Sequence, residues 1–126
     1  TSASEPIVDG DWFAPGTHIS GIGSHSPGAR ELDVKTICRA RVVGDLVDAC
    51  KAESGDFIIP VQNGEWSWDK IAGSLGDVVT GKIPGRTSPD EITLFKSNGL
   101  AIQDMSTARA VYDEAVKKGI GVEFEF

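Results

Sequence analysis

The stretch PGRTSPDEITLFKSNG, at residues 84–99, decides how the chain is interpreted. A Pro-Gly turn leads into a short apolar strand at residues 92–95, which runs directly into Ser97 and Asn98, where we expect a long helix to begin. The first backbone N–H groups of a helix have no partner within it, so they are available to a phosphate or a carboxylate. The stretch therefore predicts an α/β element with an anion site, but no particular reaction.

Strands and helices are expected to alternate outward from this stretch, which favours an α/β fold with a partly parallel sheet. The amphipathic spacing at residues 101–115 predicts a long helix that ends at Gly119. Apolar residues alternate with glutamates at 122–126, which predicts a final short strand. The other expected elements are strands at 17–22 and 41–45, a helix capped by Asp33 that runs to residue 39, helices at 47–52 and 68–75, and a strand or an extended connector at 57–61.

The amino-acid composition excludes some classes of function. The 126 residues are 40% hydrophobic, which suits one core, so we treat residues 1–126 as a single unit. A net charge of −7 argues against nucleic-acid binding, which requires clustered lysines and arginines. No apolar run approaches the roughly 20 residues of a membrane span, and we see no leader peptide, so we expect a cytoplasmic protein without a membrane partner. Both cysteines, Cys38 and Cys50, are expected to be buried, reduced thiols.

Two segments imitate nucleotide-binding motifs. Residues 76–82 match most of a phosphate-binding loop, but Ile83 stands where a serine or threonine must hold magnesium, and Pro84 prevents a helix from continuing. The Gly-Ile-Gly at residues 21–23 follows a strand, yet Ser26 occupies the third glycine position of the dinucleotide fingerprint. We reject the first segment and regard the second as a weak candidate for the main pyrophosphate site.

The loop at residues 21–28 is nevertheless a candidate ligand site, because it follows the carboxyl end of a predicted parallel strand. His25 lies in this loop and could transfer protons near neutral pH, although a loop histidine without a role is the alternative. His18, inside the strand, is expected to be structural. Neither histidine has a carboxylate or thiolate at ligand spacing, so we predict no metal. The three tryptophans are expected to be packing residues, with a recognition surface as the alternative: Trp12, Trp66 and Trp68.

Three segments resemble the ornithine cyclodeaminase/mu-crystallin family, and they occur in the family's order over nearly the whole chain. They are PGTHISGIGSHSPG at residues 15–28, which continues into ELD at 31–33, LGDVVTGKIPGR at 75–86, and the opening stretch extended through LAIQD to residue 104. The resemblance implies an NAD(P)-dependent protein. Ornithine cyclodeaminases, alanine dehydrogenases and ketimine reductases belong to this family, and some members bind the cofactor in a non-enzymatic role.

The resemblance also implies the fold and the site. The fold would be a partial Rossmann-like domain, the C-terminal half of an NAD(P)-binding domain, without the glycine fingerprint and without the N-terminal half that holds substrate and forms the dimer. His25 stands where cyclodeaminases have an aspartate that handles the substrate proton, and a histidine still serves as an acid or a base. Ala29 replaces a cofactor-contacting lysine of some members. The resemblance places Asn98 beside the substrate, and it places beside the cofactor Thr1, Ile22, Gly23, Ser24, His25 and Ser97.

Two hypotheses about function follow. The first is the C-terminal part of an NAD(P)-dependent enzyme that deaminates or reduces amino or imino acids by hydride transfer, inactive as this piece alone and assembled as a homo-oligomer, most simply a dimer. The second is a stand-alone, non-catalytic module that oligomerises or binds the cofactor. An exposed strand edge and apolar face would favour self-association under either hypothesis. A proteolytic remnant without a role of its own fits the same sequence.

Overall fold

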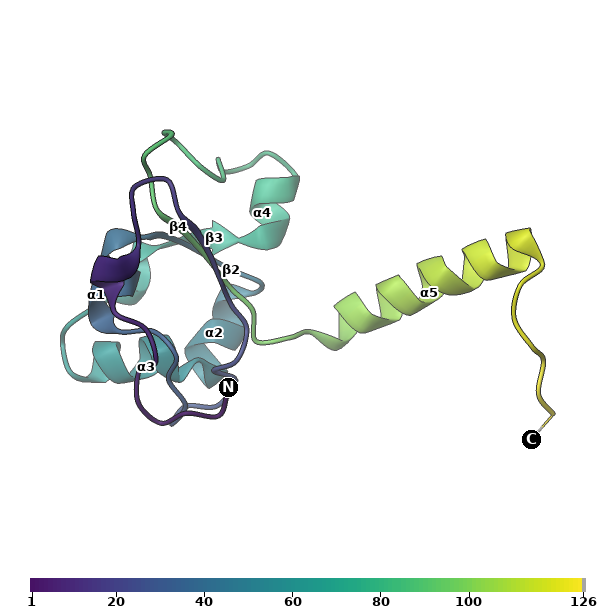
Figure 1. Cartoon of the computed structure of the whole chain (residues 1–126), viewed down its shortest axis with the longest axis horizontal. Coiled ribbons are helices and arrows are strands. Elements are labelled where there is room, and N and C mark those ends of the chain that lie inside the picture. The colour runs from purple at the N-terminus through teal and green to yellow at the C-terminus, as the bar shows by residue number, and fades with distance from the viewer. Residues whose placement is uncertain (126) are drawn as a thin grey trace.

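The computed structural model describes residues 1–125 and shows a parallel four-stranded sheet from which one helix projects (Figure 1). The strand order is β1-β4-β2-β3, and all three pairings are parallel. The predicted α/β fold is therefore confirmed. The strands are β1 His18–Gly21, β2 Arg41–Gly44, β3 Ile71–Ser74 and β4 Thr93–Lys96. The helices are α1 Val34–Arg39, α2 Val47–Glu53, α3 Gly55–Gln62, α4 Leu75–Val79 and α5 Ala101–Lys118, with 3-10 turns at Gly10–Trp12 and Trp68–Lys70.

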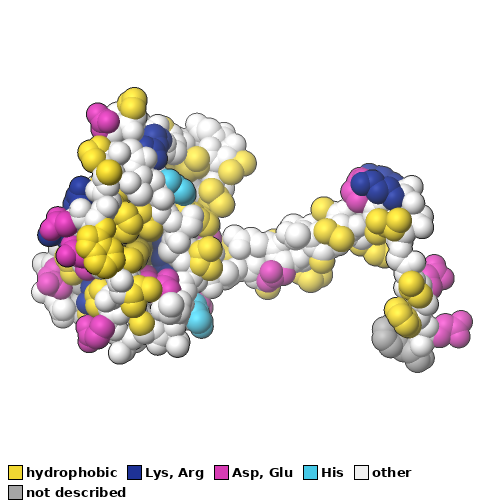
Figure 2. Space-filling view, viewed as in Figure 1, with side chains coloured by type: hydrophobic (Ala, Val, Ile, Leu, Met, Phe, Trp, Pro, Cys, Tyr) yellow, Lys and Arg dark blue, Asp and Glu magenta, His cyan; other side chains and the backbone are white. Residues whose placement is uncertain are grey.

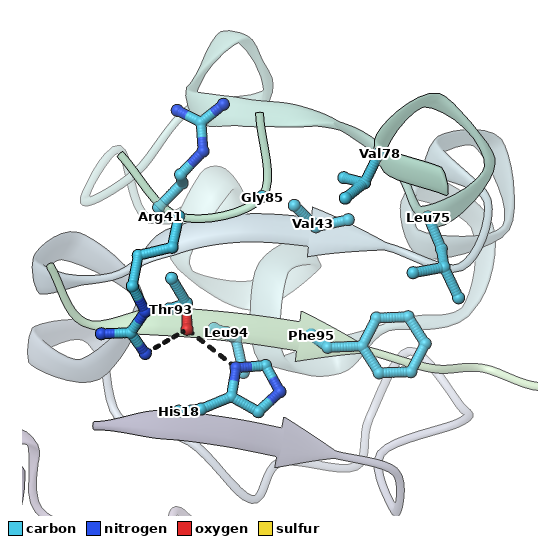
Figure 3. A pocket seen from close by; sticks show the side chains of 10 residues that line it. His18, Arg41, Val43, Leu75, Val78, Gly85, Thr93, Leu94 and Phe95 are labelled. Carbon is cyan, nitrogen blue, oxygen red and sulfur yellow. Dashed lines mark hydrogen bonds between the residues drawn. The ribbon is translucent and has the colours of Figure 1, made fainter. Parts of the chain in front are cut away.

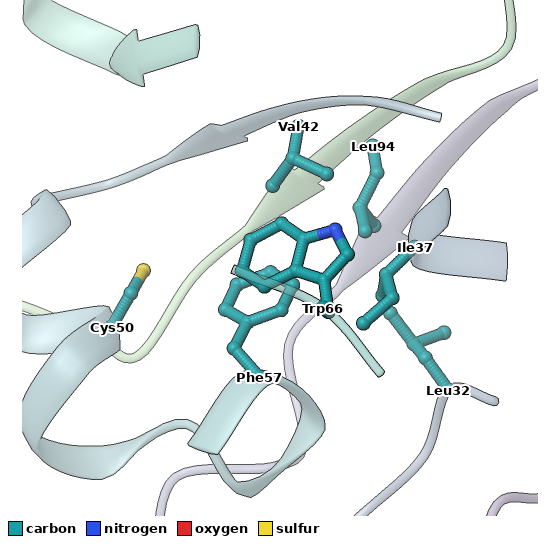
Figure 4. Close-up of a cluster of buried hydrophobic side chains, with 7 residues drawn as sticks. All are labelled: Leu32, Ile37, Val42, Cys50, Phe57, Trp66 and Leu94. Carbon is teal, nitrogen blue, oxygen red and sulfur yellow. The ribbon is translucent and has the colours of Figure 1, made fainter. Parts of the chain in front are cut away.

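The core lies between one face of the sheet and helices α1, α2 and α3 (Figure 4). Val42 and Leu94 point from the two central strands toward these helices. Phe57 of α3 is fully buried and stacks on Trp66, with the ring centroids 5.0 Å apart. Aromatic stacking adds to the energy of burial, so this pair anchors α3 to the sheet.

The aromatic and cysteine predictions hold only in part. Trp66 is buried and Trp68 packs edge-on against it, but Trp12 is 71% exposed. Cys50 is buried, and burial raises the pKa of its thiol to about 12. Cys38 is exposed, because its side of α1 faces solvent rather than the sheet. The predictions that Trp12 is a packing residue and that Cys38 is buried are therefore wrong.

Two segments adopt different structures from those predicted. Residues 57–61 belong to α3, not to a strand or connector, because Asp56, Phe57 and Pro60 form one buried side at helical spacing. A short apolar run does not by itself distinguish a strand from a buried helix. The predicted helix at 68–75 is instead a 3-10 turn followed by β3 and α4, because residues 71–74 gain hydrogen bonds at the edge of the sheet beside β2.

Helix α5 ends as predicted but begins later. Gly119 terminates it with φ +63°, a conformation that suits glycine, whereas the first helical residue is Ala101 and Leu100 precedes it without a side-chain cap. None of its residues is buried, and a narrow connection joins it to the rest of the molecule (Figure 2). The final strand predicted at 122–126 is not formed at residues 122–125, where no neighbouring strand is present to pair, and Phe126 lies outside the described residues. Within residues 1–125 no helix is long and apolar enough to cross a membrane.

Asp33 caps α1 as predicted, and its removal should be costly at neutral pH. Its carboxylate accepts hydrogen bonds from the backbone N–H groups of Thr36 (2.8 Å) and Gly10 (3.0 Å). Burial raises the pKa of Asp33, but a hydrogen bond from the Thr36 hydroxyl and the two backbone N–H groups outweigh burial and hold the pKa below its ordinary value. The stabilisation is thus present above the unfolded-state pKa of about 3.9 and is lost as the pH falls through the folded-state pKa.

We expect Asp33→Ala to lower the free energy of unfolding by about 1–2 kcal/mol at neutral pH. Urea denaturation at neutral pH and below the folded-state pKa measures the effect, which should shrink in acid. Asp48→Ala, at an exposed carboxylate in the first turn of α2, is the control and should change little at either pH. An Asp33→Ala deficit that stays the same in acid would contradict the assignment.

Candidate functional site

The carboxyl ends of three parallel strands meet at one edge of the sheet, which we call the site edge. Gly21 of β1 and Gly44 of β2 are both in register with Lys96 of β4. The segments that follow these residues are therefore neighbours, although they are far apart in the sequence. Ligands of open α/β sheets bind at such carboxyl ends.

Asp45, directly after β2, fixes one of these segments. Its Oδ2 accepts hydrogen bonds from Ser97 Oγ (3.1 Å) and from the backbone N–H groups of Asn98 (2.7 Å) and Gly99 (2.9 Å). Its Oδ1 accepts the N–H of Leu46 at 2.7 Å. A nearly buried carboxylate with four donors is a rigid anchor. In the sequence, Asp45 ends a strand and completes the imitation of a dinucleotide fingerprint that begins at Gly21, but its contacts with residues 97–99 were not predicted.

Because Asp45 uses these N–H groups, the predicted anion site at Ser97 and Asn98 is wrong. Helix α5 begins at Ala101, so neither residue caps it. The backbone N–H groups that were expected to be free are bonded to a carboxylate, and that negative charge would repel an anion.

The loop at residues 22–28 is held by contacts of its own. Ser24 is buried, and its Oγ donates to the carbonyl of Ala29 (2.5 Å) and accepts the N–H of Asp56 (3.3 Å). The carboxylate of Glu31 accepts the N–H of Gly23 at 2.7 Å and also contacts the backbone nitrogen of Thr1. Of the predicted cofactor residues, Thr1, Gly23 and Ser24 therefore lie together. Ile22 is 66% exposed at the rim of the loop.

His25 presents one ring nitrogen to solvent at the site edge. Its Nδ1 lies 2.6 Å from the carbonyl oxygen of Gly23. A carbonyl oxygen only accepts, so Nδ1 carries the proton in this contact and Nε2 is the basic nitrogen. Nε2 makes no hydrogen bond to any group of residues 1–125. The ring is thus oriented by its own loop with a basic atom exposed.

Asn98 connects the two segments and has an unused polar atom. Its Nδ2 lies 3.4 Å from the carbonyl oxygen of Ser24, across the site edge. Its Oδ1 is buried and finds no hydrogen-bond donor among the described residues. An unsatisfied buried acceptor carries a free-energy cost that a ligand N–H would remove. Asn98 Oδ1 is therefore the atom of this edge that most directly indicates a ligand.

The groups available at the site edge suit a ligand that donates a hydrogen bond better than a pyrophosphate. The N–H groups of Gly23, Asn98 and Gly99 already donate to Glu31 or Asp45. Two acceptors at this edge make no hydrogen bond within residues 1–125, Asn98 Oδ1 and His25 Nε2. A ligand N–H fits this arrangement, whereas a phosphate would meet two carboxylates.

A separate pocket of about 310 Å³ lies on the sheet face opposite the core (Figure 3). Val43 and Phe95 form its floor, and His18 bonds Thr93 Oγ1 through Nδ1 at 2.8 Å. The guanidinium of Arg41 donates to the carbonyl of Pro84. Arg41 and one ring nitrogen of His18 are thus held by the chain itself, and the structural role expected for His18 stays a prediction. Across residues 1–125 no three His, Cys, Asp or Glu side chains form a cluster that could hold a metal.

The sequence profile of the ornithine cyclodeaminase/mu-crystallin family matches residues 1–119. The chain belongs to this family. Alanine dehydrogenase of Archaeoglobus fulgidus is 37% identical over the whole chain. The match covers 39% of that protein, so the chain spans about two fifths of the length of such a relative. Membership explains why residues 76–82 imitate a phosphate-binding loop: they belong to a family segment that forms α4 and the turn after it.

Solved structures of the family have the same fold. The Delta(1)-pyrroline-2-carboxylate reductase of Thermococcus litoralis, in complex with NADH and L-proline, matches with a TM-score of 0.90 and 42% identity, over 98% of this chain and 38% of that one. An archaeal alanine dehydrogenase dimer with bound NAD matches with a TM-score of 0.86 and 36% identity, over 100% of this chain and 39% of that one. The predicted partial Rossmann-like domain is therefore confirmed.

Proposed function

We propose that residues 1–126 form one unit, the nicotinamide-side half of the NAD(P)-binding domain of an oxidoreductase that acts on a small amino or imino acid. The observation that carries this proposal is the unsatisfied Asn98 Oδ1 at an edge where two segments converge. Two related structures support the proposal: one contains NADH and L-proline, and the other contains NAD. We place the protein in the cytoplasm and expect no nucleic-acid partner.

In this proposal the residues of the chain bind, orient and exchange protons. The cofactor supplies or accepts the hydride when bound. Thr1, Ile22, Gly23 and Ser24 would border its nicotinamide end, with Ser97 on the opposite side and Asn98 Oδ1 accepting a hydrogen bond from the substrate's nitrogen. His25 Nε2 would take or return the substrate proton while Nδ1 stays bonded to Gly23.

Activity is expected to need more than these residues. The backbone N–H groups of Asn98 and Gly99 already donate to Asp45, and the relatives are longer than this chain. Reacting groups accelerate a reaction only when they are held together in one geometry. We therefore expect turnover from a longer protein that contains the chain, assembled as a homodimer, and negligible turnover from the 126 residues alone.

Replacing His25 tests the chemistry. In the longer protein we expect His25→Ala to lower kcat by about 100-fold or more, because a positioned acid or base contributes that much, while the Kd for NADH changes little. Stopped-flow oxidation of NADH with a panel of cyclic and acyclic imino acids measures both quantities. His18→Gln is the matched control, since that imidazole lies at the other end of β1. Unchanged turnover in His25→Ala would remove His25 from the mechanism.

The second candidate is a non-catalytic, self-associating module. The observation in its favour is the set of exposed apolar side chains on α5, among them Ile102, Met105, Tyr112 and Val116. Such a module would form a stable oligomer of the 126-residue chain without any oxidoreductase activity. Light scattering measures the molar mass of the chain in solution, and a stable monomer would contradict the self-associating module.

A further inference from the structure

Two opposite charges are buried together directly beneath the site edge. Lys96 and Asp56 are both fully buried, and Lys96 Nζ lies 3.4 Å from Asp56 Oδ2. Within the described part of the chain neither atom makes a hydrogen bond to any other group. Burying two charges costs so much solvation that such a pair contributes little net stability. The pair therefore requires an explanation other than stabilising the core.

Asp56 belongs to the loop side of the site edge. Its Oδ1 accepts the backbone N–H groups of Glu31 (2.6 Å) and Leu32 (2.9 Å), which follow the loop. Its own N–H donates to Ser24 Oγ inside the loop. One residue of α3 thus fixes the loop near its beginning and just beyond its end.

Lys96 belongs to the other side. It is the last residue of β4 and directly precedes Ser97 and Asn98. Its carbonyl oxygen accepts the N–H of Asp45 at 2.8 Å, and its stem passes beneath Gly21, where a Cβ would lie 3.6 Å from Lys96 Cδ. The ammonium therefore reaches from the Asn98 segment, under β1, to the residue that holds the loop.

We propose that the Lys96–Asp56 ion pair sets the separation of the two segments that build the site edge. Lys96 and Asp56 are positioning residues: they act through Ser24 and Asn98, whose carbonyl and amide face each other at 3.4 Å. The functional consequence rests on the proposed function, because the separation defines the width of the space offered to the nicotinamide and the substrate. A displacement of about 1 Å in such a site is sufficient to lower activity strongly.

The pair is suited to a test because single and double variants separate its effect on the stability of the fold from its effect on the position of the two segments. Removing one charge leaves the other buried and unpaired, which destabilises the fold, whereas removing both charges is often neutral or stabilising. Asp56→Asn retains an oxygen for the N–H groups of Glu31 and Leu32, and Lys96→Met retains most of the stem. The double variant therefore keeps most of the packing and carries no unpaired buried charge, although the new amide NH₂ of residue 56 has no acceptor.

The experiment compares Lys96→Met, Asp56→Asn and the double variant by Tm, by amide hydrogen exchange at residues 22–28, and by the Kd for NADH in the longer protein. Each single variant should lower Tm. The double variant should have a higher Tm than either single variant, yet exchange about tenfold faster at residues 22–28 and bind NADH about tenfold more weakly than the unmodified protein. A folded double variant with unchanged loop exchange would overturn the proposal.

The two readouts distinguish this inference from the proposed function. If the unmodified protein does not bind NADH, the proposed function fails, while loop exchange still decides the role of the pair. Lys35→Met with Asp11→Asn is the matched control, because it removes an exposed ion pair of 2.5 Å and should leave both readouts unchanged. Should the double variant not fold, Lys96→Arg decides: faster loop exchange at an unaltered Tm supports the proposal, and unaltered exchange overturns it.

Discussion

Phe57→Ala should lower the free energy of unfolding by about 3–5 kcal/mol, as truncation of a buried aromatic residue typically does. Phe57 is fully buried, stacks on Trp66 at 5.0 Å and meets Trp68 edge-on at 6.3 Å. The substitution removes the common neighbour of both tryptophans and leaves a cavity between α3 and the sheet. For a single small domain this is a large part of the total stability. Urea denaturation followed by circular dichroism measures the loss.

The matched control for this prediction is Trp12→Ala. It removes a larger aromatic side chain, but one that is 71% exposed, so the free energy of unfolding should change by no more than about 0.5 kcal/mol. Similar losses in the two variants would contradict the assignment of the core to the face of the sheet covered by α1, α2 and α3.

Asp45→Asn should disturb the site edge despite its small change in size. Both carboxylate oxygens accept N–H groups, Oδ1 from Leu46 and Oδ2 from Asn98 and Gly99. In either orientation the new amide NH₂ faces an N–H donor, and a buried donor without an acceptor costs about 1–3 kcal/mol. We expect a lower free energy of unfolding by that amount and a Kd for NADH raised about tenfold or more.

Isothermal titration of the longer protein with NADH measures the change in Kd. Asp48→Asn is the control, since that carboxylate lies three residues further on, in α2, and is exposed to solvent. A Kd that Asp45→Asn leaves unaltered would show that the position of Asn98 does not depend on this carboxylate.

The regular parts of the fold could be predicted because their signals are local. Strands expected at 17–22, 41–45 and 92–95 are β1, β2 and β4, each a short apolar run bounded by turn residues. The helix expected after them has the predicted period and ends at the predicted Gly119. Asp33 caps α1 because capping depends only on residues within one turn.

The errors arise where a distant residue decides the local structure. Asn98 and Gly99 do not begin α5 because Asp45, more than fifty positions earlier, takes their N–H groups. Residues 57–61 are helical because α3 buries one side against β2 and β4, which are distant from it in the sequence. Such contacts depend on the strand order β1-β4-β2-β3, which no local pattern encodes.

The same limit applies to the site. Family resemblance placed Gly23, Ser24, His25 and Asn98 in one region, and the structure brings their segments together. Asp45, Asp56 and Lys96, which hold those segments, were not recognised from the sequence. A buried carboxylate and a buried ammonium look like surface residues until the sheet order shows that they face each other.

Because α5 does not pack on the rest of the chain, the helix and the sheet unfold independently. An eighteen-residue helix without a buried side chain gains no stability from packing on the core. Its population is therefore set by the helix–coil equilibrium, which is marginal for an isolated peptide in water. Local pairs such as Arg109 with Asp113 add only about 0.2–0.5 kcal/mol each. Melting of α5 and unfolding of the sheet are therefore separate transitions, and the first can occur many times while Val42 and Leu94 remain in place.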